Sequence, residues 1–381
     1  MKYSIITPTY IEHFQFVKKY LESFDRFLVD KDQIEFVFTI RAKERKEFEH
    51  LVSNFSSLNI IIYEFEDILE SYGVGEQPDD ILQRYGKFNF QTLKKFYTIL
   101  YHPTRFSLVL DSESMLVKSV KMRDIFENYF SKPYIIASSL SERDCISDLM
   151  NSVVNARNFL LKTQNDLWFL ESFMWFYDKQ IVNDLVSSFG YPIDWLCYLS
   201  CECPHRFNLF EIDLYHSFIY LCRDKYGYKL KFSEDILRHC LGRRGCFEYH
   251  KRFKKLVNEN GGLLEHVMLL LNEKCCNDLA NMLNLEDVVI IRCEYTNYKC
   301  YQMQSEFIKH ASIVIMAASQ NHAFGLNCGD DSKFKKSAYF YKKYEKHRIL
   351  SLKQKSRVKS VFELCIAWIY KQLYLHSKNC E

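Results

Sequence analysis

The sequence has little glycine, little proline and no long uncharged run. Among its 381 residues there are only 11 glycines and 6 prolines, which argues against long flexible linkers and low-complexity tracts. We find no internal repeat and no stretch of about 18 apolar residues of the kind that spans a bilayer. The apolar run within residues 1–6 is too short for a secretory signal. We therefore expect a cytoplasmic protein without a membrane-spanning segment.

The 14 cysteines include no C-x-x-C pair. Cys201, Cys203 and His205 are close enough in sequence to be metal ligands, but no second pair with zinc-site spacing accompanies them, and Cys275 and Cys276 are adjacent. Reduced thiols are the default for a large chain that is not secreted. We expect free cysteines and no structural zinc site.

The charge is distributed unevenly. The formal net charge is +3, yet residues 333–359 contain eleven Lys or Arg side chains and one acid, Glu345. The rest of the chain is therefore acidic overall. A nucleic-acid-binding protein would carry a broader basic surface, so we expect no nucleic-acid partner.

Strand and helix patterns alternate through the first third of the chain. Residues 3–6, 34–40 and 59–63 are short apolar runs typical of buried strands. Residues 14–24 and 43–55 separate them and have helical periodicity. Because the connections are short, the strands should pair in parallel within a doubly wound sheet. This predicts an α/β fold.

Later segments extend the pattern with less regularity. Residues 67–87 contain Gly73, Gly75, Pro78 and Gly86, which predicts an irregular excursion. Residues 88–100 should form a helix whose polar face carries Lys87, Gln91, Lys94 and Lys95, and such a face is most often solvated. Further strands are predicted at residues 105–110, 134–137, 287–292 and 312–316, and aromatic-rich helices between residues 152 and 228.

An acidic pair follows the fourth predicted strand. Leu108-Val109-Leu110 leads directly into Asp111-Ser112-Glu113. Ligands of open α/β sheets bind beyond the carboxyl ends of the strands, where two carboxylates can hold Mg²⁺ or Mn²⁺ and leave positions for diphosphate oxygens. The alternative is a polar turn that only solvates the strand end.

These motifs together resemble those of GT-A glycosyltransferases. The resemblance rests on Thr7-Pro8-Thr9 after the first strand and on Asp111-Ser112-Glu113 in the place of a D-x-D motif. A Q-x-x-K helix (Gln91 to Lys94) and the F-E-x-x-L-Y sequence beginning at Phe210 are similar to those of a little-characterised bacterial group. The similarity covers about residues 1–225, and Glu113 departs from the usual second Asp.

The resemblance implies roles for individual residues. Thr7, Pro8, Thr9 and Arg41 would border the nucleotide base and ribose, and Gln91 and Lys94, or Lys95, would reach the diphosphate or sugar. Asp111 and Glu113 would hold the Mg²⁺ or Mn²⁺ ion, with His322 as a further ligand.

Three acids are candidates for catalysis. Glu211 is the preferred general base or acceptor-orienting group, because removal of the acceptor proton needs a carboxylate. Asn208-x-x-Glu211 also has the spacing of a helix capping box, which is the structural alternative. Asp194 and Asp213 are rivals. The aromatic segment 168–177 is either a sugar platform or, more commonly for such a stripe, core.

The predicted organisation is a catalytic domain over residues 1–330 and a basic helical tail over residues 331–381. Residues 1–150 would be the nucleotide-binding half, and residues 151–330 the acceptor half with a helical insert. Residues 358–375 have an amphipathic pattern with Trp368 and follow the basic run, which is typical of an anchor on an anionic membrane surface. A tail helix packed on the domain is the alternative.

We therefore expect a glycosyltransferase that moves a sugar from a nucleotide donor to a bacterial cell-surface glycan or glycolipid. The sequence leaves inversion or retention open. A sugar nucleotidyltransferase is an alternative, although Thr7-Pro8-Thr9-Tyr10 lacks its glycine-rich phosphate loop. A non-catalytic membrane-peripheral scaffold on the same fold is another, and Glu113 is the only sequence feature that favours it.

Overall fold

The computed structural model describes residues 2–116, 118–140, 148–169, 175–203, 207–236, 238–239, 242–244 and 246, and the backbone of residues 288–293 and 311–316. Its centre is a five-stranded sheet in the order β3-β2-β1-β4-β8. The strands of this sheet are β1 (Tyr3–Pro8), β2 (Ile34–Ile40), β3 (Asn59–Glu64), β4 (Phe106–Val109) and β8 (Phe176–Asp178). All pairs are parallel except β4 with β8. The α/β fold class predicted from the sequence is confirmed.

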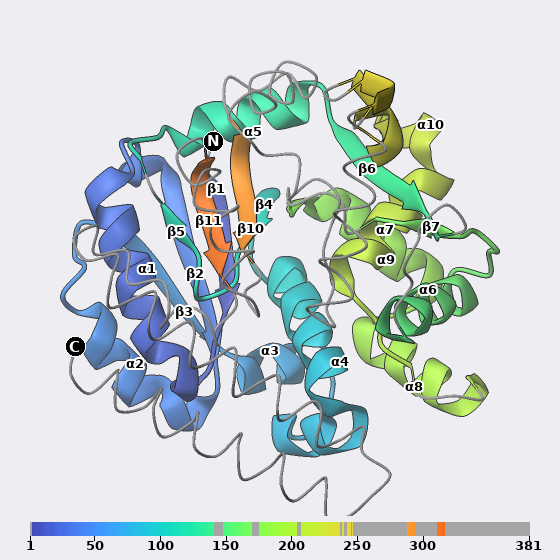
Figure 1. Ribbon diagram of the computed structural model, residues 1–381. Helices are drawn as coiled ribbons and strands as arrows, with labels where there is room; N and C mark the ends of the chain where they lie inside the picture. The colour runs from blue at the N-terminus through green and yellow to red at the C-terminus, as the bar shows by residue number, and fades with distance from the viewer. Residues whose placement is uncertain are drawn as a thin grey trace, which may run out of the picture.

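Helices cover both faces of this sheet (Figure 1). On one side lie α1 (Phe14–Phe27) and α2 (Arg45–Val52), and on the other α3 (Phe65–Ser71) and α4 (Pro78–Tyr101). The helix α1 forms because its apolar residues recur every three or four positions, and its Phe14, Val17, Leu21 and Phe24 are all buried. The predicted positions of β1, β2, β3 and α1 are confirmed.

Two smaller sheets lie beside the main one. The first has the order β10-β11-β5, formed by β5 (Met115–Leu116), β10 (Val288–Cys293) and β11 (Ala311–Met316). The second has the order β7-β6-β9, formed by β6 (Tyr134–Ser139), β7 (Leu167–Trp168) and β9 (Lys229–Phe232). The late strands predicted near residues 134, 287 and 312 therefore exist, but outside the main sheet.

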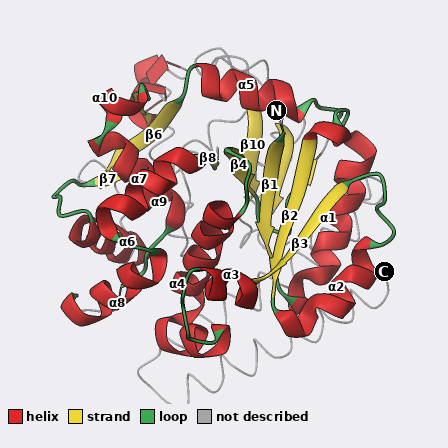
Figure 2. Cartoon of the chain, turned by 180° about the vertical axis from the view of Figure 1, so that it is seen from behind, coloured by secondary structure: helices red, strands yellow, loops and turns green. Residues whose placement is uncertain are grey.

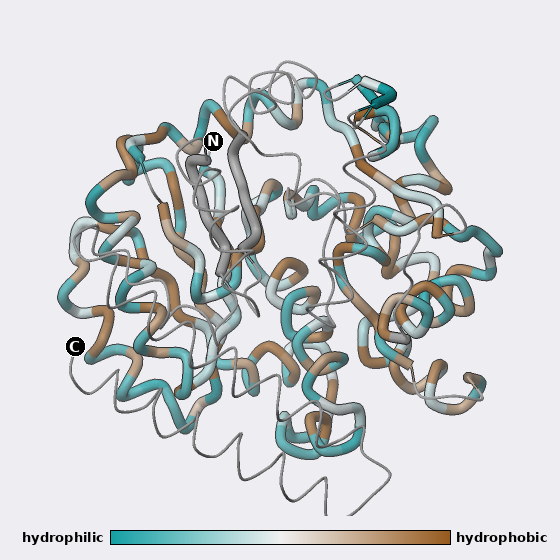
Figure 3. Tube along the Cα trace, viewed as in Figure 1, coloured by the Kyte–Doolittle hydropathy of each residue, from teal (hydrophilic) through white to brown (hydrophobic). Residues whose placement is uncertain are grey.

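The second half of the described chain is mostly helical (Figure 2). Its helices pack beside α4, which contacts three of them. They are α6 (Asp148–Leu160), α7 (Lys179–Phe189), α8 (Pro192–Glu202), α9 (Glu211–Leu221) and α10 (Arg223–Tyr226), and α5 (Met122–Ser131) precedes them in the chain. Along the peripheral helices hydrophobic and hydrophilic segments alternate (Figure 3), as expected where one face is buried.

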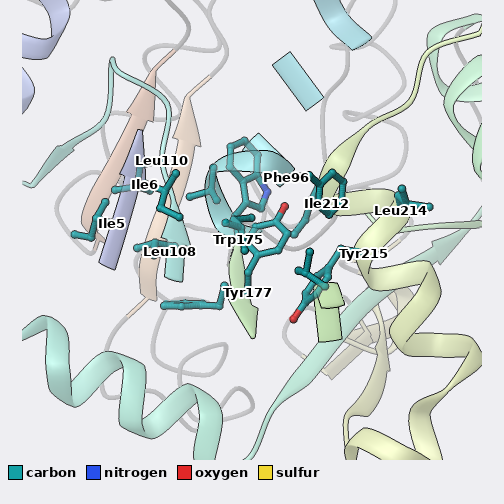
Figure 4. Close-up of a cluster of buried hydrophobic side chains, with 14 of the residues drawn as sticks. Ile5, Ile6, Phe96, Leu108, Leu110, Trp175, Tyr177, Ile212, Leu214 and Tyr215 are labelled. Carbon is teal, nitrogen blue, oxygen red and sulfur yellow. The ribbon is translucent and has the colours of Figure 1, made fainter. Parts of the chain in front are cut away.

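One hydrophobic core joins the two halves. In Figure 4, Trp175 and Tyr177 lie between Leu108 of β4 and Tyr215 of α9. Trp168 and Phe169, like Trp175, Phe176 and Tyr177, are at most 2% exposed. The core interpretation of the aromatic segment is confirmed for these residues, while residues 170–174 lie outside the described part.

The prediction of an irregular segment over residues 67–87 is wrong. It contains most of α3 and the first two turns of α4. Pro78 is the first residue of α4, where its missing N–H costs nothing because that group has no helical partner. The break is confined to Gly86, whose φ of 77° and ψ of 164° divide α4 into two helical segments. A glycine adopts this conformation without the strain that a Cβ would add.

Five described cysteines, Cys197, Cys201, Cys203, Cys222 and Cys246, are free thiols, while His205 lies outside the described residues. Among the residues placed by the structure, no helix is long and apolar enough to cross a bilayer. The division at residues 150 and 330 stays a prediction, and the tail 331–381 lies outside the described residues.

Candidate functional site

A cavity of about 430 Å³ opens at the carboxyl ends of β1, β2 and β4. This is the edge at which open α/β sheets bind ligands, and the volume is within the usual range of small-molecule sites, about 300–1,000 Å³. Its walls come from the ends of the strands and from both segments of α4, and its lining residues include Pro8, Thr9, Tyr10, Arg41, Lys43, Asp79, Lys87, Gln91, Lys94, Lys95 and Asp111. The sequence predicted seven of these as site residues: Pro8, Thr9, Arg41, Gln91, Lys94, its alternative Lys95, and Asp111.

Arg41 is a fixed part of the wall. Its side chain follows β2, is only 10% exposed, and donates from Nε to Glu66 at 3.0 Å and from Nη1 to Asp79 at 2.9 Å. Burial opposes the charge of Arg41, but its hydrogen bonds to Asp79 and Glu66 prevail and raise its pKa. The same hydrogen bond lowers the pKa of Asp79 to about 2. The pair ties the first segment of α4 to the end of β2.

Lys94 is a buried amine at the floor of the cavity. Its Nζ donates to the carbonyl oxygen of Thr9 at 2.8 Å, and the residue is 4% exposed. Burial lowers the pKa of Lys94 to about 7. The hydroxyl of Thr9, itself 1% exposed, has no hydrogen-bond partner within the described part of the chain. A ligand oxygen near Thr9 would satisfy this hydroxyl, whose isolation otherwise costs free energy.

Lys95 is a buried cation between two carboxylates. Its Nζ lies 2.6 Å from Oε1 of Glu211 and 3.3 Å from Oδ1 of Asp111, and 5.1 Å from the ring centre of Trp175. Burial opposes its charge, but Asp111 and Glu211 outweigh that effect and raise the pKa of Lys95. Lys95 therefore stays positively charged at the cavity wall. The interpretation of the lysine face as solvated is wrong for Lys94 and Lys95.

Glu211 supports Lys95 from behind the cavity wall. It is 1% exposed, accepts a hydrogen bond from Thr92 at 3.0 Å and does not line the cavity. It is the first residue of α9, whose N-cap is Phe210. The capping box suggested by Asn208 and Glu211 is therefore not formed.

The Asp111-Ser112-Glu113 motif has two carboxylates, and of these only that of Asp111 lines the cavity. The side chain of Asp111 is 31% exposed. Glu113 is 8% exposed, lies 3.8 Å from Nδ1 of His13, and accepts from the Ser112 hydroxyl at 3.3 Å. Within the described ranges no group of three His, Cys, Asp or Glu side chains is arranged to hold a metal. His322 lies outside those ranges.

Tyr10 and His13 were not predicted as site residues from the sequence, and Lys87 was expected only on a polar helix face. Lys87 donates to the Tyr10 hydroxyl at 2.8 Å, and that hydroxyl lies 2.5 Å from Nε2 of His13. Burial, with Lys87 nearby, lowers the pKa of His13 to about 4, so its ring is neutral at pH 7. Nδ1 of His13 lies 2.9 Å from the Ser112 hydroxyl. This series of contacts links the cavity to the turn after β4. In the sequence, only the adjacency of Tyr10 to Thr7-Pro8-Thr9 indicated that Tyr10 would lie near the site.

Three other predicted residues lie elsewhere. Thr7 is fully buried and donates to the Tyr20 hydroxyl at 3.2 Å. Asp194 caps α8 by accepting from the backbone N–H of Tyr191 at 2.8 Å. Asp213 is buried in an ion pair with Arg157 at 3.2 Å. None of the three lines the cavity.

Comparisons with known proteins give distant likenesses in structure only. No family model matches the chain, and no curated protein matches it. Mouse xyloside xylosyltransferase 1 in its apo form matches 61% of this chain and 85% of its own with 12% identity and a TM-score of 0.38. The glycosyltransferase GlyE of Streptococcus pneumoniae TIGR4 matches 98% of this chain and 64% of its own with 10% identity and a TM-score of 0.37.

A third solved structure is S. aureus TarS 1-349 in complex with UDP. It matches all of this chain and 92% of its own, with 12% identity and a TM-score of 0.28. Since all three TM-scores are below 0.5, the function of this chain has to be inferred from its own residues.

Proposed function

We propose that the chain is a glycosyltransferase that binds a nucleotide-sugar donor in the cavity at the ends of β1, β2 and β4. The observation that carries this proposal is the placement of Lys95 and Asp111 at one wall of a cavity that also contains Thr9, Arg41 and Lys94. A cation fixed before the ligand arrives stabilises a diphosphate leaving group without reorganisation during the reaction.

The residues divide into two groups by their chemistry. Arg41, held by two acids, and Thr9, whose hydroxyl has no partner among the residues that the structure describes, present a fixed polar wall suited to a base and ribose. Lys94 and Lys95 present amines suited to a diphosphate. The diphosphate would sit near Lys95, whose charge Glu211 maintains. Glu211 is then a positioning residue rather than the general base expected from the sequence.

A divalent cation fits this site with one protein carboxylate. Mg²⁺ is commonly held by one or two carboxylates together with phosphate oxygens, and the partly exposed carboxylate of Asp111 meets that need. When bound, the cation would neutralise charge on the diphosphate. Glu113 would join only after leaving Ser112 and His13, so we propose Asp111 as the principal metal ligand.

We also propose a bacterial cell-surface glycan or glycolipid as the acceptor, reached at the cytoplasmic face of the membrane. Support comes from the sequence alone, through the basic run of residues 333–359 and the amphipathic pattern that follows. Flotation of the full chain and of a chain ending at residue 330 with phosphatidylglycerol vesicles tests this. Equal flotation of the two chains would remove the membrane proposal.

Isothermal titration of the full chain with UDP, GDP and CMP, each with and without Mn²⁺, tests donor binding. We expect one nucleotide to bind and Asp111→Ala to weaken its binding in the presence of Mn²⁺. Asp194→Ala is the matched control, since that carboxylate caps α8 away from the cavity. Absence of binding by all three nucleotides would contradict the proposal and favour the scaffold alternative.

A further inference from the structure

A second cavity, of about 1390 Å³, lies between α6, the turn after it and the end of α8. Its volume exceeds the range of about 300–1,000 Å³ that is usual for small-molecule pockets. A groove of this size suits a ligand of several linked units. We call it the amide groove, because five of its lining residues are amides: Asn151, Asn155, Asn158, Gln164 and Asn165.

The exposed amides are available to a ligand. Asn151 and Asn155 are one helical turn apart on α6 and are therefore neighbours on its surface. They and Gln164 are exposed, and their side-chain amides bond to no other side chain within the described residues. An amide offers donors and an acceptor together, so a row of amides matches vicinal hydroxyl groups, each of which also donates and accepts.

Two aromatic rings accompany the amides. Phe159 and Tyr198 are each 38% exposed, and their ring centres are 5.7 Å apart. Large exposed rings beside a cavity are characteristic of binding surfaces. A pyranose presents C–H groups on its face and hydroxyls around its edge, so rings beside amides complement both parts of a sugar.

The wall of the groove is held rigidly from behind. Arg157 is fully buried and donates to the carbonyl oxygen of Leu167 at 2.8 Å and to Oδ1 of Asn165 at 3.0 Å. Asn158 donates to the carbonyl oxygen of Asn165 at 2.7 Å. The turn at residues 161–166 is therefore ordered before any ligand binds, which lowers the entropic cost of binding.

The charge of the groove lining indicates a ligand whose charge differs from that of a nucleotide. Among the described lining residues only Lys162 and Asp166 are charged, and their charges are opposite. Among these described residues an anionic ligand would find no excess of cations. The lining therefore favours a neutral ligand.

The groove is linked to the cavity described above by residues 207–211. Phe207 lines the groove, and its carbonyl oxygen accepts from Asn89 of α4 at 3.2 Å. Oδ1 of Asn89 accepts from the backbone N–H of Leu209 at 2.7 Å, and Glu211 then contacts Lys95. Five consecutive residues thus run from the groove wall to the support of the lysine.

We propose that the amide groove binds a neutral oligosaccharide, with Phe159 and Tyr198 against sugar faces and Asn151, Asn155 and Gln164 on the hydroxyls. The groove selects the glycan on which the enzyme works. The selection of an acceptor rests on the proposed transferase function, whereas binding of the oligosaccharide does not.

The test is binding of the labelled full chain to a printed array of neutral and anionic glycans, followed by titration of the retained glycan. We expect retention of neutral oligosaccharides, and at least tenfold weaker binding for Phe159→Ala/Tyr198→Ala and for Asn155→Ala. Tyr101→Ala is the matched control, because Tyr101 is also 38% exposed but does not line the groove. Circular dichroism and unfolding midpoints verify that the variants fold.

Retention of no glycan, retention of anionic glycans only, or equal binding by the groove variants and Tyr101→Ala would each overturn the proposal. Titration with UDP, GDP and CMP distinguishes failure of the groove proposal from failure of the proposed function. Nucleotide binding without glycan binding refutes the groove alone, and glycan binding without nucleotide binding refutes the donor site alone.

Discussion

The two cavities differ in how they would obtain binding free energy. The cavity beside β1, β2 and β4 contains five Lys or Arg side chains, some already paired with acids. The described lining of the amide groove instead consists mainly of amides and rings, with one charge of each sign. Electrostatic interactions depend on pH and salt, while hydrogen bonds from amides and ring contacts depend on neither to the same degree. Conditions and substitutions can therefore separate the two sites.

Substitution of Lys95 should have the largest effect. Lys95→Met leaves Glu211 buried without its cation, which should lower the free energy of unfolding by about 3–5 kcal/mol. Loss of the cation should also weaken binding of the nucleotide (written here and below as UDP, for whichever of UDP, GDP and CMP binds) by about 2 kcal/mol or more, roughly thirtyfold. Urea unfolding and isothermal titration measure these two quantities.

The double variant Lys95→Met/Glu211→Met is the control for Lys95. Replacing both members of a buried ion pair is often close to neutral for stability, so the double variant should regain stability without regaining nucleotide affinity. Recovery of both would mean that Lys95 acts only through the fold.

Asp111→Asn distinguishes a metal-bound from a metal-free diphosphate. With Mn²⁺ present, loss of the carboxylate should weaken UDP binding by about tenfold or more. Without the metal, removal of a negative charge near an anion should instead tighten binding by a few-fold. Tighter binding in the presence of Mn²⁺ would contradict the role of Asp111 as a metal ligand.

The affinity for UDP should fall as pH rises above 7. The pKa of Lys94 is about 7 in the free protein, and a bound diphosphate favours the charged amine and raises that pKa. Below pH 7 the amine is already protonated and binding is strongest. Above pH 7 Lys94 must take up a proton when the nucleotide binds, so the affinity falls by up to about tenfold per pH unit.

Titrations between pH 6 and 9 measure this dependence. Lys94→Gln should bind UDP more weakly at low pH and show a flatter profile, because no proton is taken up at that position. The same slope in the variant would assign the dependence to another group. Glycan binding in the amide groove should not change over this range.

Salt should have the smallest effect. Raising the ionic strength from about 0.1 to 0.5 M should weaken UDP binding only a few-fold, because part of the site is buried and screening acts mainly on exposed charges. Binding of a neutral glycan should be unchanged. A glycan affinity that falls with salt as steeply as the UDP affinity would contradict the neutral character of the groove.

The sequence predicts the sheet better than the site. Ile34–Ile40 and Phe14–Phe27 carry their periodicity locally, so the pattern alone indicates β2 and α1. The position of Asp111 could also be predicted from the sequence, because it depends only on where β4 ends. Pro78 and Gly86 led to the wrong prediction of an irregular segment, because residues that break a helix can also begin a helix or divide it.

The surroundings of the lysines could not be predicted locally. Lys95 lies on the polar side of a helix pattern, and its partner Glu211 comes from α9, more than a hundred residues later. Glu211 and Asp194 looked alike as isolated acids. Their environments differ because one faces a buried amine and the other a helix N-terminus.

The break at Gly86 has an electrostatic consequence for the cavity. The helical segment after it begins at Lys87, and residues of its first turn, Lys87 and Phe90, line the cavity. The positive end of a helix dipole, equivalent to roughly half an elementary charge, therefore lies beside the cavity. This contribution comes from the backbone, so no side-chain replacement within the cavity removes it.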